Sequence, residues 1–280
     1  MKFTVIGSNG FIGSALSIKM RAEGYSVFTP SRGDDKIFSI PLNHVIYAAG
    51  VTSNFRLNPF NTLQANTSYL AEILEKSCFD SLLYLSSSRI YRHAESTQED
   101  AAIFLKSYDP EDLYDLTKLT AEALCYARED LNHKVKVVRL SNVIGTDFRS
   151  QNFLFDIIRS ACDDGVIYLR SSLDSCKDYV MLEDVIELLP KIATIGKHKC
   201  YNVASGHNLT HQDIVNSIIK CTKARLEISN DTPTVRFSRL DVSKILEEFT
   251  YKPSNVLNCI PRLVLEYKNS KTKPNINIKG

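Results

Sequence analysis

The chain has 280 residues, of which 44% are hydrophobic, so it can bury the core of one large domain or of a domain with a smaller lobe. Its 34 basic and 32 acidic residues are interspersed, and the formal net charge of +2 gives no reason to expect a nucleic-acid partner. The seven cysteines form no C-x-x-C pair and no metal-ligand spacing, so we expect reduced thiols, no metal site and a cytoplasmic protein. We expect neither a signal peptide nor a membrane partner, because no apolar run reaches membrane-spanning length.

Short apolar runs alternate with segments of helical period along the first half of the chain. This pattern predicts buried strands at residues 3–7, 25–30, 44–50, 81–87 and 136–145, and helices at 11–22, 66–76 and 114–129. The alternation is typical of an α/β fold with a doubly wound parallel sheet. The segment between Arg32 and Val45 is too short for a strand and a full crossover helix, so we expect that side of the sheet to be trimmed.

The stretch "GSNGFIG" stands directly after the first predicted strand and before the first helix. Glycine permits a tight turn, close approach of the backbone to a pyrophosphate and close packing of helix on sheet, while the helix N-terminus offers N–H groups to the anion. The alternative is a glycine turn without a ligand. The motif predicts cofactor contacts from Gly7, Asn9, Gly10, Phe11, Ile12 and Gly13.

The end of the second predicted strand bears on the choice of dinucleotide. An acidic residue there favours NAD(H), because it accepts hydrogen bonds from the ribose, whereas an arginine suits the additional phosphate of NADP(H). Ser31 and Arg32 come first in this chain, and Asp34 and Asp35 follow. We therefore favour NADP(H). NAD(H) stays open, because Asp34 would reach a ribose if the short loop folded back.

The stretch "YDLTK" begins a predicted helix, and its i, i+4 spacing puts Tyr114 and Lys118 on one face. A lysine ammonium beside a phenol can lower the phenol's pKa from about 10 toward neutrality. A tyrosine tuned in this way can exchange a proton with a substrate oxygen. Taken alone, the spacing also suits a solvated surface pair.

Taken together, these motifs give the chain a resemblance to a known family. Residues 1–265 resemble the extended short-chain dehydrogenase/reductases, the NAD(P)-dependent family of nucleotide-sugar epimerases, dehydratases and reductases. The resemblance rests on "GSNGFIG", "YAAG", Asn66 at a helix start, "SSSRIY", "YDLTKLTAE", "RLSNVIG", "DYVMLEDV" and "YNVASG". It implies a Rossmann-type sheet with a small C-terminal substrate-binding lobe, and a homodimer formed through helices 66–76 and 114–129.

The resemblance also implies catalytic roles. The family's catalytic Ser or Thr precedes the tyrosine of S-S-x-x-x-Y by four residues, which selects Ser87, with Ser88 as a lesser candidate that would contact the substrate. Tyr114 would exchange a proton with the sugar oxygen, and Ser87 would hydrogen-bond that oxygen. Lys118 would bind the nicotinamide ribose and bias Tyr114.

Further contacts follow from the same resemblance. Ala48, Ala49 and Gly50 are small enough for the cofactor to lie close, and Asn66 would either contact the cofactor or simply cap its helix. The family suggests that the substrate, a nucleotide-diphosphate sugar, is contacted by Asn142. Arg170 and Arg236 are either surface residues or clamps for its diphosphate.

Departures from the family pattern narrow the reaction. Family dehydratases carry an Asp-Glu pair where this chain has Ser88 and Arg89, and GDP-fucose synthases carry a cysteine at the position of Ser88. What remains is NADPH-dependent reduction of a nucleotide-linked keto-deoxysugar, which we favour, or C4 epimerisation with bound NAD. A protein that senses NADP(H) without turnover is a third reading, and the intact catalytic set argues against it.

The alternation of elements becomes irregular after Gly145, which suggests a boundary there. We expect a dinucleotide-binding domain at residues 1–145, joined by parts of 174–205. Residues 146–173 and 206–267 would form the substrate-binding lobe, and the Lys-containing residues 268–280 a flexible tail.

Overall fold

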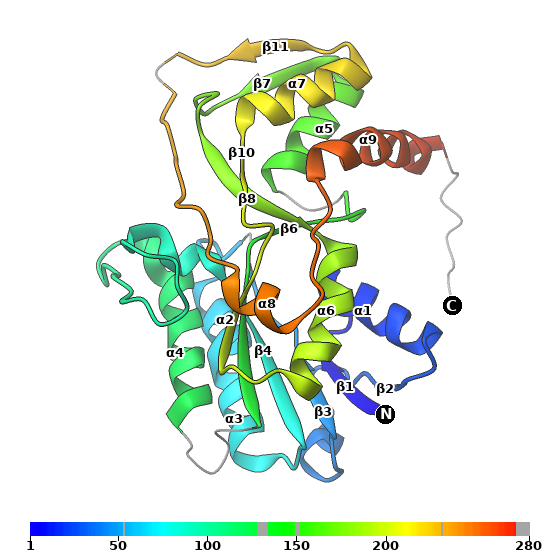
Figure 1. The fold of residues 1–280 in the computed structure, drawn as a ribbon, viewed down its shortest axis with the longest axis vertical. Helices are drawn as coiled ribbons and strands as arrows, with labels where there is room; N and C mark the ends of the chain where they lie inside the picture. The colour runs from blue at the N-terminus through cyan, green and yellow to red at the C-terminus, as the bar shows by residue number, and fades with distance from the viewer. Residues whose placement is uncertain (53, 128–133, 149–151, 231, 273–280) are drawn as a thin grey trace.

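A computed structural model describes residues 1–52, 54–127, 134–148, 152–230 and 232–272 of the chain. Figure 1 shows a layered α/β body below and a smaller group of strands and helices above it. None of the described helices is long and apolar enough to cross a membrane. All seven cysteines are free thiols.

The lower body is built on a six-stranded sheet in the order β2-β1-β3-β4-β5-β9, in which every pairing is parallel. The strands are β1 (Lys2–Ile6), β2 (Ser26–Phe28), β3 (His44–Tyr47), β4 (Ser81–Ser87), β5 (Val135–Leu140) and β9 (Cys200–Val203). This arrangement confirms the predicted doubly wound parallel sheet.

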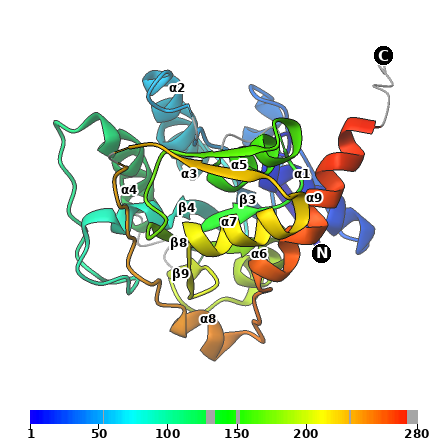
Figure 2. The same cartoon turned by 90° about the horizontal axis from the view of Figure 1, so that it is seen from above.

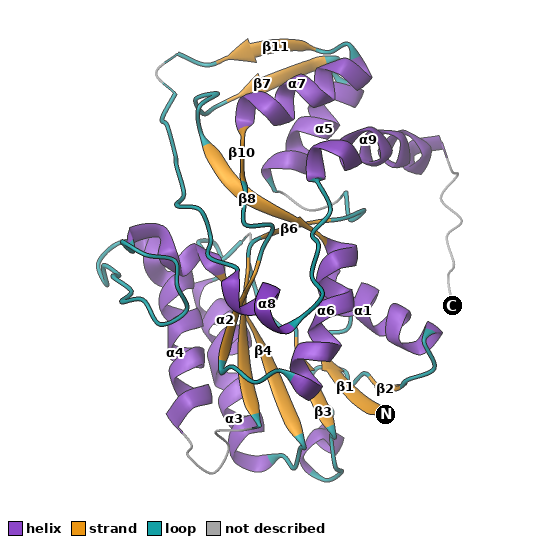
Figure 3. Ribbon diagram, in the orientation of Figure 1, coloured by secondary structure: helices purple, strands orange, loops and turns teal. Residues whose placement is uncertain are grey.

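Helices cover both faces of the sheet because successive residues of each strand point to opposite faces. On β4, Leu83 and Leu85 pack with α1 (Phe11–Ala22) and α6 (Leu182–Ile195). Leu82 and Tyr84 face the other way, toward α3 (Tyr69–Lys76) and α4 (Leu113–Ala127). Figure 3 shows the two helical layers on either side of the strands.

The trimmed side of the sheet is confirmed. Strand β2 is the edge strand, and one 3₁₀ turn, η1 (Asp35–Phe38), is the only regular element between it and β3. The Asp34 carboxylate caps this turn by accepting a hydrogen bond from the backbone N–H of Lys36 at 3.1 Å. Ile37 is 1% exposed and anchors the short connection in the core.

Several predicted elements have different bounds in the structure. The helix predicted to start at residue 66 begins earlier, as α2 (Pro59–Leu63), and runs through a π-helical turn, Gln64–Ser68, into α3. The strand predicted at 136–145 is interrupted, because the chain leaves the central sheet after β5 and continues as β6 (Asn142–Ile144) in another sheet. The predicted helix 114–129 ends at Ala127, and its last two residues lie outside the described part.

The upper lobe has its own core, formed mainly by buried side chains of its helices and strands. Its elements are a three-stranded sheet of β10 (Asn208–Thr210), β8 (Cys176–Met181) and β6, a two-stranded sheet of β11 (Arg225–Ile228) and β7 (Val166–Leu169), and helices α5 (Phe153–Asp163), α7 (His211–Thr222) and α9 (Val256–Thr272). Figure 2 shows α7 and α9 from above, over the central body.

Residues 182–203 return from the upper lobe to the central sheet as α6 and β9, and α8 (Ser243–Glu248) also contacts β9. Residues 268–272, which we expected in a flexible tail, continue helix α9, and residues 273–280 lie outside the described residues. The division into domains at the proposed boundaries stays a prediction.

Candidate active site

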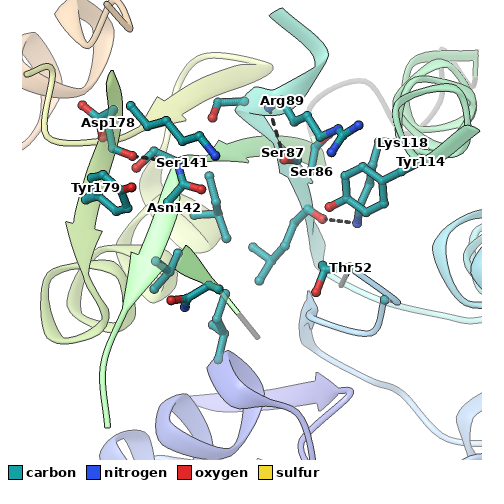
Figure 4. Close-up of a pocket in the computed structure, with 18 of the residues that line it drawn as sticks. Thr52, Ser86, Ser87, Arg89, Tyr114, Lys118, Ser141, Asn142, Asp178 and Tyr179 are labelled. Atoms are coloured by element: carbon teal, nitrogen blue, oxygen red, sulfur yellow. Dashed lines mark hydrogen bonds between the residues drawn. The ribbon is translucent and has the colours of Figure 1, made fainter. Parts of the chain in front are cut away.

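A cavity of about 590 Å³ lies where the carboxyl ends of the central strands meet the upper lobe. Its wall combines residues from the ends of β3 and β4, the start of α4, and strands β6 and β8 (Figure 4). Ligands bind at the carboxyl ends of the strands in open α/β sheets. This cavity is therefore the candidate active site.

The glycine turn after β1 leaves no room for side chains. Gly7 has a positive φ of 87°, and a Cβ on it would lie 2.5 Å from the backbone nitrogen of Ala49. A Cβ on Gly13 would lie 2.3 Å from the carbonyl oxygen of Gly7. Helix α1 begins after Gly10 with no side-chain cap, so its first N–H groups are available to an anion such as a pyrophosphate.

The predicted cofactor residues fall into two places. Phe11, Ile12, Ala48, Ala49 and Gly50 line the main cavity. Asn9 and Gly10 line a second hollow on the outer side of the glycine turn, which Phe11 also borders. The glycine turn and the "YAAG" segment therefore meet, as a bound dinucleotide requires.

Asn66 neither caps a helix nor lines the cavity. It lies inside the π-helical turn and is fully buried. Its Nδ2 donates to Thr117 Oγ1 at 3.0 Å, and its Oδ1 accepts from the backbone N–H of Val51 at 3.2 Å. The side chain thus ties the loop after β3 to helix α4, and the expectations of a cap or a direct cofactor contact find no support here.

Ser87, Tyr114 and Lys118 meet on one wall of the cavity (Figure 4). Ser87 ends β4, and the i, i+4 spacing on α4 puts Tyr114 and Lys118 side by side. Lys118 Nζ donates to the carbonyl oxygen of Leu85 at 2.9 Å and lies 5.8 Å from the centre of the Tyr114 ring. Ser88 also lines the cavity. The structure brings together the three side chains predicted as the catalytic set and the lesser candidate Ser88.

Burial dominates the titration of this set. It raises the pKa of Tyr114 to about 12, and a hydrogen bond from Ser87 opposes the rise. It also lowers the pKa of Lys118 to about 7, against the field of Glu122. The expectation that the Lys118 ammonium brings the Tyr114 pKa toward neutrality is therefore wrong for this structure, because desolvation of the phenolate outweighs the hydrogen bond from Ser87 and the charge of Arg89.

The pKa of Lys118 predicts a pH-dependent stability. Between the folded value of about 7 and the ordinary value of 10.5, the unfolded chain binds more protons, so stability rises with pH across this window. The difference in unfolding free energy between wild type and Lys118→Met should increase in favour of wild type by about 1 kcal/mol per pH unit from pH 7 to 8.5, because the folded lysine is already half deprotonated at pH 7. Urea unfolding of both proteins at the two pH values measures it.

The exposed Lys191, paired with Glu187 at 3.0 Å, provides the control, and Lys191→Met should show no such slope. If the difference in unfolding free energy between wild type and Lys118→Met stays constant with pH, the lowered pKa of the buried Lys118 is contradicted.

The residues at the end of β2 lie outside the cavity lining. Ser31 and Arg32 are exposed, and Arg32 Nη2 donates to Asn61 Oδ1 at 3.3 Å. Asp34, the alternative ribose ligand, is engaged as the cap of η1. Arg32 is thus the better placed of the two to meet a group arriving at this edge of the sheet.

The substrate contacts predicted in the C-terminal half are only partly brought together. Asn142 lines the cavity, and its Nδ2 donates to the carbonyl oxygen of Asp178 at 2.8 Å. Arg170 is exposed and Arg236 lies 3.5 Å from Asp174, and neither lines the cavity. The diphosphate contacts expected of these two arginines gain no support.

Sequence reasoning missed the cations that do line the cavity, which are Arg56, Arg89 and Lys177. Lys177 directly precedes the "DYV" motif on β8, and that adjacency was the available signal. Arg89 was noted only as a departure from the family pattern. Nothing in the local sequence marks Arg56, which reaches the site through a loop.

Comparisons with known proteins agree with this geometry. Residues 3–204 match the model of the NAD dependent epimerase/dehydratase family. No curated protein matched the chain significantly.

Among solved structures, RMD from Pseudomonas aeruginosa complexed with NADPH is 22% identical, with a TM-score of 0.80 over 96% of this chain and 99% of that one. A UDP-glucuronic acid 4-epimerase mutant from Bacillus cereus, in complex with a UDP-sugar and NAD, is 18% identical. Its TM-score is 0.81, and the match covers 96% of this chain and 100% of that one. UDP-glucose 4-epimerase from Thermotoga maritima, with UDP-glucose, is 18% identical. Its TM-score is 0.76, and the match covers 97% of this chain and 100% of that one. The glycine turn, the cavity and the family match over most of the chain together show that this protein belongs to the NAD dependent epimerase/dehydratase family.

Proposed function

We propose that the protein reduces a nucleotide-linked keto-deoxysugar with NADPH. The observation that carries the proposal is the meeting of Ser87, Tyr114 and Lys118 in one cavity, which Phe11 and Ile12 directly after the first glycines of the turn also line. When bound there, NADPH supplies the hydride. Ser87 hydrogen-bonds the ketone oxygen, Tyr114 donates a proton to it, and Lys118 holds the ribose hydroxyls.

The protonation of Tyr114 favours reduction. A phenol with a pKa of about 12 keeps its proton at neutral pH, which suits a group that must give a proton to the product oxygen. Epimerisation begins with oxidation of the sugar, which requires the same tyrosine to accept a proton. C4 epimerisation with bound NAD is the second candidate, because it uses the same three residues and two of the similar structures are 4-epimerases.

The cavity is poorly equipped to eliminate water. Asp178 is the one carboxyl side chain among the described residues that line it. Both of its oxygens are occupied, because they accept hydrogen bonds from Ser205 and from the backbone N–H of His207 at 2.8–3.0 Å. The positions that hold the acid and base of family dehydratases are Ser88 and Arg89 here, so a dehydratase reaction has no free carboxyl group.

The substrate we propose is a nucleotide-diphosphate sugar. Several similar structures contain UDP-sugars, which supports this class. Lys177 and Asn142 lie on neighbouring strands of the upper sheet and both line the cavity, so we propose that they meet the diphosphate in place of Arg170 and Arg236. A homodimer formed through α3 and α4 stays a prediction, and the mass in solution at micromolar concentration tests it.

An NADPH-oxidation assay against nucleotide-linked 4-keto-6-deoxysugars tests the proposed reaction, with an epimerisation assay on UDP-hexoses beside it. We expect substrate-dependent oxidation of NADPH. Turnover of UDP-hexoses without net oxidation would replace the reductase by the epimerase. Cofactor binding without either activity would favour a sensor of NADP(H).

Arg32 provides a test of cofactor choice. If its guanidinium pairs with the 2′-phosphate, Arg32→Ala should weaken NADPH binding by about 1.5–3 kcal/mol and leave NADH binding almost unchanged. Titration of the protein's fluorescence with each cofactor measures both affinities. Arg170→Ala, which removes an exposed arginine outside the cavity, is the matched control. An equal loss for NADPH and NADH would assign Arg32 another role.

A further inference from the structure

Arg89 occupies an unusual place in the cavity. It lies two residues after Ser87, on the 3₁₀ turn η3 (Ser88–His93), and lines the cavity wall. Its backbone N–H donates to Ser87 Oγ at 3.2 Å, so the arginine and the serine are fixed relative to one another. The Arg89 side chain therefore borders the space that a sugar occupies when its reacting oxygen meets Ser87.

The guanidinium of Arg89 is held by hydrogen bonds to Asp115 and Glu111. Its Nε donates to Asp115 Oδ2 at 3.2 Å, and its Nη2 donates to the carbonyl oxygen of Glu111 at 2.8 Å and to Glu111 Oε2 at 3.3 Å. Asp115 is fully buried. Nη1 has no hydrogen-bond partner among the described residues. Since a guanidinium only donates, Nη1 calls for an acceptor atom.

An aromatic surface lies beside this free donor. The Arg89 guanidinium carbon is 5.2 Å from the centre of the Phe55 ring, and the Phe55 ring centre is 5.6 Å from that of Tyr114. All three side chains line the cavity. A group that reaches Nη1 therefore meets an apolar ring next to the catalytic tyrosine.

Charged side chains of both signs surround Arg89. Arg56, whose guanidinium carbon is 4.4 Å from the Phe55 ring centre, also binds the carboxylate of Glu111. The two guanidiniums face two carboxylates, Glu111 and Asp115, whose pKa values of about 2 and about 6 leave both ionised at neutral pH. Lys177 on β8 adds a positive charge that interacts with Arg89 across the cavity. Because the apolar ring of Phe55 lies beside the Arg89 guanidinium, an acceptor oxygen that carries an apolar group fits this corner better than a bare anion.

We propose that Arg89 determines substrate specificity: its Nη1 donates to the neutral carbonyl oxygen of an acylamino group on the sugar, and the acyl methyl packs against Phe55. The inference rests on the proposed function, because it takes the ligand of this cavity to be a nucleotide sugar. It narrows the substrate class to acylamino sugars.

Binding measurements test this without turnover. Calorimetry with UDP, dTDP and GDP first identifies the nucleotide, and the glucose, N-acetylglucosamine and glucuronate derivatives of that nucleotide are then compared. We expect the N-acetyl sugar to bind about tenfold more tightly than the glucose derivative, the size of one charge-assisted hydrogen bond. In Arg89→Gln this preference should fall to about twofold or less, while the affinity for the nucleotide alone is unchanged.

Removing Arg89 leaves Asp115 buried without its cation, so the double variant Arg89→Gln/Asp115→Asn separates the two effects. The double variant should also lack the preference, because neither change restores Nη1. Arg236→Gln, an exposed arginine outside the cavity, is the matched control and should keep the preference. Arg89→Lys should lose it as well, which gives a conservative substitution if glutamine disturbs the fold.

Each outcome bears on a different claim. A preference that persists in Arg89→Gln or in the double variant overturns the role of Arg89. If the glucuronate derivative binds most tightly, the claim that Arg89 Nη1 donates to a neutral carbonyl oxygen is overturned. If none of the three nucleotides binds, the proposed function fails, and the Arg89 proposal falls with it, whereas nucleotide binding without an acyl preference overturns Arg89 alone.

Discussion

Tyr114→Phe is expected to lower kcat by about 10²- to 10⁴-fold while cofactor affinity and stability stay near wild type. The reason is that the substitution removes the proton that we assign to the product oxygen and leaves the ring, which is 6% exposed and packs against Phe55. Steady-state kinetics with the substrate found in the NADPH-oxidation assay measure kcat, and a fluorescence titration measures cofactor binding.

Substitutions of Ser87 and Lys118 should change kcat and cofactor affinity in different ways. Ser87→Ala should lower kcat by removing a hydrogen bond to the reacting oxygen, and Lys118→Met should lower both kcat and cofactor affinity, because Lys118 has both roles. Tyr168→Phe is a matched control, since that tyrosine is 56% exposed on β7 and does not line the cavity. Near-normal turnover by Tyr114→Phe would refute the mechanism.

Arg139→Met is expected to cost about 3–5 kcal/mol of unfolding free energy, because it leaves a buried carboxylate without its cation. The side chains of Arg139 and Glu122 are 6% and 3% exposed. Arg139 Nη2 donates to Glu122 Oε2 at 2.7 Å, and Arg139 Nη1 donates to Tyr91 Oη at 2.6 Å. Urea unfolding of wild type and variant measures the loss.

Two further variants test whether the loss comes from the buried ion pair of Arg139 and Glu122. Arg139→Met/Glu122→Gln should recover part of the loss, because it removes the stranded charge as well. Lys19→Met breaks the exposed i, i+4 pair with Glu23 and should cost less than about 1 kcal/mol. A loss for Arg139→Met as small as that for Lys19→Met would show that the buried pair contributes little.

Part of the site followed from local pattern alone. The strand-turn-helix with glycines at 7, 10 and 13 was readable because only glycine fits where the backbone segments of Gly7, Gly13 and Ala49 approach so closely. Tyr114 and Lys118 were placed together by helical spacing, which tertiary packing does not alter. The short connection after β2 was read from its length, because a crossover helix needs a minimum of residues.

The misread positions depend on contacts between distant parts of the chain. Asn66 looked like a helix cap, but its partners Val51 and Thr117 are fifteen and fifty-one residues away. The chain leaves the central sheet after Leu140 because β6 pairs with β8, which no periodicity in residues 136–145 could show. In both cases the hydrogen-bonding partner is far away along the chain, so the local sequence gives no sign of it.

The sequence by itself was enough to recognise the family, to predict the order of strands and helices as far as Leu140, and to propose the Ser, Tyr and Lys set, because these rest on motifs of short-range spacing and on backbone sterics. Only the tertiary structure decided which cations line the candidate active-site cavity, since Arg89 and Lys177 line it whereas Arg170 and Arg236 do not. It also decided the titration of Tyr114, because burial depends on how the sheet, helix α4 and the loops pack together, and desolvation there outweighs the nearby charges.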